Sequence, residues 1–140
     1  MINTIIKAAE NFCIHQIRVP HTVHDDIADA KTLIAYIDIE TNSMDKYRIY
    51  LSADKAFMQR ISFLFLEENE SNDDTLKDIL LETLNLIVGS AKVLSEDTDS
   101  PFSIKTPHFE KNDLFDLEYD MLKTIQVQDD KLSIAIKEIN

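Results

Sequence analysis

A carboxylate and a carboxamide, Glu82 and Asn85, stand three residues apart in a segment whose apolar residues follow the helical period. Residues at this spacing share one face of a helix, so the two side chains are expected to lie side by side. A carboxamide donates and accepts hydrogen bonds and can hold a water molecule against an electrophile, although it is no proton-transfer base at neutral pH. A carboxylate can pair with a lysine of another molecule. The E-x-x-N spacing alone has little specificity, because such pairs often arise by chance.

The pair belongs to a longer polar stripe, whose members follow one another at intervals of four, three, four and three residues: Asp78, Glu82, Asn85, Gly89 and Lys92. Gly89 is the only glycine in 140 residues, whereas average usage predicts about ten. Glycine in a helix interior costs about 1 kcal/mol relative to alanine. Its presence therefore has two explanations: a side chain there would clash inside the protein, or a partner approaches the stripe closely.

One long helix must present this stripe. We expect it to begin at an Asp73 or Asp74 cap and to run to about Leu94. Its opposite face carries the apolar row that would pack on the core: Leu76, Leu80, Leu84, Ile87, Ala91 and Leu94. The stripe would then be exposed on the outer face of the helix.

The other elements predict an α+β fold with three helices and five or six strands in an antiparallel or mixed sheet. The first helix covers residues 2–17 with Asn3 or Thr4 as its cap, and Ser52 opens the second helix at 53–66. The expected strands are 33–39 and 47–51, which form a hairpin, followed by 102–105, 115–121, 124–127 and 132–136. Because no repeat or linker divides the chain, residues 1–140 are expected to form a single domain.

Composition limits the class of protein and its partners. With 44% hydrophobic and 29% charged residues, the chain should fold as a globular protein. Its net charge of −12 repels nucleic acid and anionic lipid and favours a basic or mixed protein partner. Neither a signal peptide nor an apolar run long enough for a bilayer is evident, so we expect a cytoplasmic protein.

The remaining reactive side chains are weaker candidates. Cys13 lies on the apolar face of the first helix, which favours core packing over a reactive thiol. The H-x-x-H-D cluster at His21 and His24 could bind Zn²⁺ or Ni²⁺, but without a helix to make the imidazoles converge a surface loop is favoured. The other histidines, His15 and His108, are isolated. The acidic run 67–74 lacks the pattern of a calcium loop, and no metal site is predicted.

The helix sequence Asp78-Ile-Leu-Leu-Glu82-Thr-Leu-Asn85-Leu-Ile-Val-Gly89-Ser-Ala91-Lys resembles the CheX and CheC phosphatases of bacterial chemotaxis. Their helix signature is E-x-x-N followed by apolar residues and glycine. The order of elements is similar too, with a hairpin and a helix before the motif and a strand with Thr106-Pro107 after it. The resemblance covers residues 2 to about 137, and one E-x-x-N helix rather than two favours CheX over CheC.

The resemblance implies that the substrate is the phosphorylated receiver CheY, whose phospho-aspartate is hydrolysed with a Mg²⁺ ion held by the receiver. Asn85 would orient the attacking water, and Glu82 would pair with the receiver's active-site lysine. The other stripe residues, Asp78, Gly89 and Lys92, would contact the partner, and this chain would bind no cofactor itself. The family also suggests a homodimer formed through sheet edges.

Two other functions remain open at this point. The same fold family supplies flagellar switch components that bind signalling proteins without hydrolysis, so the chain could be a non-catalytic binding module. It could also be a structural dimer module, if the stripe were buried between two copies. A pure adaptor would not need the pair Glu82 and Asn85.

Overall fold

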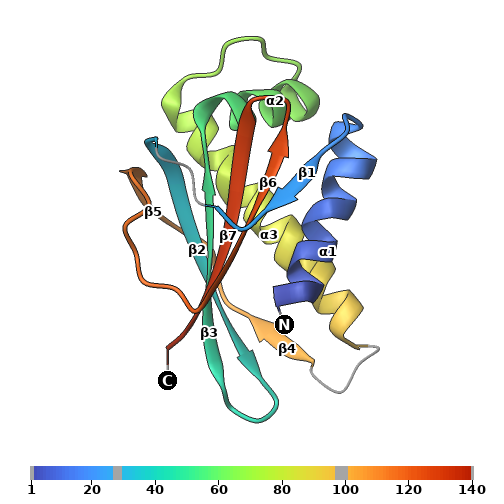
Figure 1. The fold of residues 1–140 in the computed structure, drawn as a ribbon, viewed down its shortest axis with the longest axis vertical. Helices are drawn as coiled ribbons and strands as arrows, with labels where there is room; N and C mark the ends of the chain where they lie inside the picture. The colour runs from blue at the N-terminus through green and yellow to red at the C-terminus, as the bar shows by residue number, and fades with distance from the viewer. Residues whose placement is uncertain (1, 27–29, 97–100, 140) are drawn as a thin grey trace.

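The computed structural model in Figure 1 describes residues 2–26, 30–96 and 101–139. As predicted, the fold is α+β, with helices packed on one antiparallel sheet. The sheet has seven strands within these ranges, slightly more than expected, in the order β1-β6-β7-β3-β2-β4, with β5 also paired to β2. None of the described helices is long and apolar enough to cross a membrane.

The helices are α1 (Ile2–Phe12), continued by the π-helical turn η1 (Cys13–Ile17), then α2 (Lys55–Leu66) and α3 (Asp73–Glu96). The strands are β1 (Thr22–His24), β2 (Thr32–Thr41), β3 (Lys46–Ala53), β4 (Phe102–Ile104), β5 (His108–Asp113), β6 (Met121–Val127) and β7 (Asp130–Glu138). The predicted hairpin is confirmed as β2 and β3, whose register runs from Leu33 opposite Ala53 to Glu40 opposite Lys46.

The main core lies between the helices and one face of the sheet. Figure 1 shows α1 and α3 side by side on this face, with α2 at the upper end of the sheet. Every second residue of β2, from Leu33 to Ile39, points into this core, as the two-residue period of a strand requires. The helices contribute large buried side chains such as Ile5, Phe57 and Leu84. This packing holds α3 in place along the sheet.

The opposite face of the sheet carries a smaller apolar cluster, and here one sequence prediction is wrong. Residues 115–121 were expected to form a strand because Phe115, Leu117, Tyr119 and Met121 alternate with polar residues. Instead, 114–120 is a connection without strand pairing, and Phe115 and Leu117 pack on Ile34 and Tyr50 of the sheet. The strand in this region is β5, whose polar, largely exposed residues gave no apolar signal.

The helix caps differ from those predicted. Helix α1 begins at Ile2, so Asn3 and Thr4 are inside it and do not cap it. Helix α2 is capped by Asp54, whose Oδ1 accepts a hydrogen bond of 2.7 Å from the Phe57 N–H, while Ser52 belongs to β3. The same carboxylate accepts a 2.9 Å bond from the N–H of Lys131, which ties α2 to the β6–β7 hairpin.

Among the residues that the structure describes, four other than glycine have left-handed backbone conformations, namely Arg18, Met44, Glu67 and Gln128, with φ between 55° and 67°. Arg18 and Glu67 end η1 and α2, and their N–H groups donate to carbonyls of the last helical turn. Met44 and Gln128 lie in the turns of the two hairpins. Glycine is the residue that adopts this conformation most readily, yet the single glycine lies elsewhere, inside α3.

Candidate functional site

Helix α3 is fixed at its start and along its inner face. The side chain of Asn72 accepts a 2.8 Å hydrogen bond from the N–H of Thr75, so the cap is one residue before the predicted Asp73. Asp73 and Asp74 occupy the first turn, where negative charge favours the positive end of the helix dipole. The predicted core-facing row is buried except for Leu94, which packs on the edge of the core. The helix is therefore a firm support for its outer side chains.

The predicted polar stripe is exposed on the outer face of α3. Asp78, Glu82 and Asn85 are exposed, and Gly89 and Lys92 are partly exposed. Within the part of the chain that the structure describes, the side chains of Asp78, Glu82 and Asn85 make no hydrogen bond or ion pair. Their donors and acceptors are thus turned to solvent and available to a second molecule.

Gly89 is not needed to relieve crowding. A Cβ atom built at this position would meet no atom within 4 Å beyond the chain neighbours and the helix's own nearby backbone. Its backbone does not have the positive φ that would demand glycine either. The first of the two explanations for this glycine, a clash inside the protein, is therefore wrong. The fold would tolerate a side chain here, and close approach of a partner stays a prediction.

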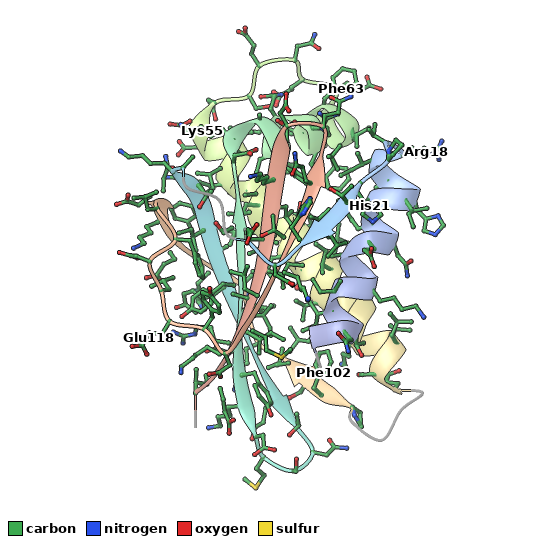
Figure 2. All side chains as sticks on the ribbon, viewed as in Figure 1. Arg18, His21, Lys55, Phe63, Phe102 and Glu118 are labelled. Atoms are coloured by element: carbon green, nitrogen blue, oxygen red, sulfur yellow. The ribbon has the colours of Figure 1, made fainter. Side chains whose placement is uncertain are left out.

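The other reactive side chains do not gather at the stripe. Cys13 is buried in the core, as predicted, and burial together with the nearby Glu10 raises the pKa of its thiol to about 11, so that it stays protonated at neutral pH. His21 lies beside α1 (Figure 2), where its Nε2 is 3.0 Å from the Glu10 carboxylate. His24 instead contacts the hydroxyl of Thr22.

The candidate metal ligands are likewise dispersed. The two histidines of the H-x-x-H-D cluster have separate partners, and no group of three metal-ligating side chains occurs in the described residues. In the acidic run 67–74, Ser71 bonds to Gln59 through its N–H, while Asn72 caps α3. Residues 67–72 of the run form a surface loop that connects α2 to α3, and Asp73 and Asp74 already belong to α3.

One feature was missed in the sequence. A groove of about 260 Å³ runs between α1–η1 and α3, and we call it the α1–α3 groove. Phe12 and Phe65 line it, and α3 contributes Leu86 and Ser90 to its wall. A signal was present, since Leu86 follows Asn85 directly and Ser90 follows Gly89. The helical period thus puts both residues on the flank of the stripe.

Three solved structures show the same fold at low sequence identity. A chemotactic CheC-like protein from Shewanella oneidensis is 15% identical, with 99% of this chain and 97% of that chain covered and a TM-score of 0.83. CheX from Vibrio vulnificus is 14% identical, with 97% and 98% covered and a TM-score of 0.79. The structure of a CheX–CheY–BeF₃–Mg²⁺ complex from Borrelia burgdorferi matches with 14% identity, 98% and 97% coverage and a TM-score of 0.70.

No curated protein matches the sequence closely enough to count as a relative. Residues 34–131, however, match the family described as chemotaxis phosphatase CheX. This match covers well over half of the chain and includes β2, β3, α2, all of α3 and the strands up to the start of β7. The motif helix, the fold and the family match agree, and the chain belongs to the CheX family of chemotaxis phosphatases.

Proposed function

We propose that this protein accelerates hydrolysis of the phospho-aspartate of a CheY-type receiver. Asn85 orients the attacking water, and Glu82 pairs with the receiver's active-site lysine. The observation that carries the proposal is an exposed carboxamide and carboxylate, without partners in the described chain, on a capped and well-packed helix of a CheX-family protein. The family resemblance suggested the two roles, and the exposure of both groups supports them.

The chemistry requires positioning rather than a strong base. The water oxygen forms a bond to phosphorus while the bond from phosphorus to the aspartate oxygen breaks, which leaves the receiver carboxylate and inorganic phosphate. A carboxamide suits the task because its oxygen accepts a hydrogen bond from the water while its NH₂ group donates to a phosphoryl oxygen. The rigid attachment of Asn85 to α3 lowers the entropic cost of this arrangement. The Mg²⁺ ion belongs to the receiver in this proposal.

Glu82 acts as the orienting contact. Its carboxylate lies nearly one helical turn before Asn85 on the same face, so both can reach a single pocket of the partner. A charge-assisted bond to a lysine would fix the register of α3 against the receiver and thereby the position of the carboxamide. The complex of CheX with CheY, BeF₃ and Mg²⁺ from B. burgdorferi supports a receiver as the partner.

The rest of the stripe contributes to docking. Gly89 leaves free space one turn after Asn85, which lets the partner's backbone approach the helix. Asp78 extends the negative surface one turn before Glu82, whereas Lys92 supplies a positive charge at the other end of the stripe. The receiver therefore meets a stripe that is negatively charged at its start and positively charged at its end.

The test is dephosphorylation of the CheY-type receivers of the same organism, phosphorylated with a small-molecule donor. We expect the wild-type chain to shorten the lifetime of one of them, and Asn85→Ala to lose about 100-fold of this acceleration, as when one transition-state contact is removed. Asn112→Ala is the matched control, because Asn112 is also exposed but lies on β5.

Two outcomes contradict the proposal. If wild type leaves the lifetime of every receiver unchanged, the protein is not a phosphatase, and a non-catalytic binding module becomes the better description, provided that the receiver still binds. If Asn85→Ala is as active as Asn112→Ala, hydrolysis does not depend on the carboxamide.

A further inference from the structure

We propose that the α1–α3 groove is a second contact site for the same receiver and holds an apolar side chain that lies beside the receiver's phosphorylation pocket. This inference rests on the proposed function, which it extends from two polar residues to a two-part interface. In this interface the stripe supplies the chemistry and the groove supplies affinity.

The groove has an apolar wall beside a polar one, since Phe12, Phe65 and Leu86 line it together with Asn11, His15, Gln16 and Ser90. The rings of Phe12 and Phe65 meet edge to face, with centroids 6.1 Å apart, and both line the groove. Leu86 is 41% exposed at its wall. The volume of the groove, about 260 Å³, is below the usual range of small-molecule sites, which is about 300–1,000 Å³. An inserted protein side chain fits this space better than a cofactor does.

The position of the groove determines its occupant. Leu86 and Ser90 are the direct chain neighbours of Asn85 and Gly89, so the groove begins where the stripe ends. A globular partner seated on Glu82 and Asn85 must extend sideways, because a specific interface covers about 800 Å² on each protein. Two polar side chains cannot provide that area. On one flank of the stripe, the adjacent surface is the groove. The apolar centre of an interface usually supplies much of the affinity, and the groove can take that part.

Charge also distinguishes this groove from a second one at α2. None of the residues known to line the α1–α3 groove is an aspartate, glutamate, lysine or arginine, in a chain with 26 acidic residues. The second groove includes Leu64 but also the ion pair of Arg60 with Asp130, 2.8 Å apart. Figure 2 shows Phe63, which also lines this second groove, at the α2 end of the molecule. Of these two grooves, only the α1–α3 groove includes direct chain neighbours of stripe residues.

The experiment compares Leu86→Gln with Leu64→Gln, two leucines that are both 41% exposed on helices. Binding is measured with the CheY-type receiver loaded with BeF₃⁻ and Mg²⁺, and turnover with the phosphorylated receiver. We expect Leu86→Gln to weaken binding and raise KM about tenfold, with kcat nearly unchanged, since glutamine keeps the helix but removes the apolar contact. Leu64→Gln should behave as wild type.

A second variant, Ser90→Trp, fills the groove and should raise KM in the same way. Thermal unfolding checks that each variant is folded. Wild-type KM in both Leu86→Gln and Ser90→Trp, combined with inactivity of Asn85→Ala, overturns the groove as a contact site while the proposed function stands. A wild-type chain that neither binds nor dephosphorylates any receiver overturns the proposed function and the groove together.

Discussion

The inner face of α3 buries Leu80, Leu84 and Ile87 against the core, whereas the outer face exposes Glu82 and Asn85 to solvent. Buried and exposed side chains thus follow one another along the same turns of α3. On the inner face each side chain has many neighbours within the chain. On the outer face, the polar groups of Glu82 and Asn85 have no described partner in the chain. This difference teaches that stability and activity should be separable by substitutions only one residue apart.

The largest expected effect is on the inner face. Leu84 is 1% exposed, so Leu84→Ala should lower the free energy of unfolding by about 3 kcal/mol through lost burial and a cavity. At the neighbouring position, Asn85→Ala should change the free energy of unfolding by less than about 0.5 kcal/mol. Urea unfolding of both variants measures the contrast. Equal destabilisation of the two would show that the outer face also supports the fold.

The next effect concerns the chemistry of the outer face. Asn85→Asp keeps the shape of the side chain but replaces the NH₂ donor with a negative charge that repels the phosphoryl group. We expect activity on the phosphorylated receiver to fall about 100-fold, with unfolding unchanged. Activity close to wild type would mean that position 85 contributes shape rather than a donor.

A smaller effect is expected for Glu82→Gln, which removes the charge and keeps the length. Loss of a charge-assisted bond to the receiver's lysine should raise KM about tenfold. Because salt screens exposed charges, the difference from wild type should shrink when the assay is repeated at high ionic strength. A difference independent of salt would exclude a simple ion pair at Glu82.

Gly89→Ala should give the smallest change, and this change should have opposite directions for stability and for receiver binding. The added methyl meets no atom within 4 Å, so alanine should raise the free energy of unfolding by about 1 kcal/mol. If the receiver approaches closely here, the same methyl should weaken its binding. Thermal unfolding and receiver binding then move in opposite directions. Improved stability with unchanged binding would remove Gly89 from the interface.

The sequence was sufficient to predict α3 and its stripe because a helix of this length repeats its period several times. The core-facing row from Leu76 to Ala91 and the exposed pair Glu82 and Asn85 both follow from that repetition. The β2–β3 hairpin was likewise predicted, since apolar, β-branched strands flank a polar turn. Exposure of the stripe is confirmed, whereas the roles of its residues stay predictions.

Short or edge elements were not predictable in the same way. Strand β5 is polar and largely exposed, so no alternation marks it, whereas the apolar alternation of 115–121 reflects packing of Phe115 and Leu117 on the sheet without strand pairing. The α1–α3 groove depends on how two helices distant in sequence lie together. The helical period places Leu86 and Ser90 beside the stripe, but no local pattern shows that α1 lies next to them. The predicted cap of α2 was also wrong: Ser52 and Asp54 are both good capping residues, and the cap is Asp54.

The four residues with left-handed backbone conformations are positions at which the fold could be stabilised by substitution. Arg18, Met44, Glu67 and Gln128 adopt a conformation that costs other residues roughly 1 kcal/mol more than glycine. Each position ends a helix or turns a hairpin, and none belongs to the stripe. A designer could therefore place glycines there to strengthen the framework first. The outer face of α3 could then be rebuilt for a different receiver on a more tolerant support.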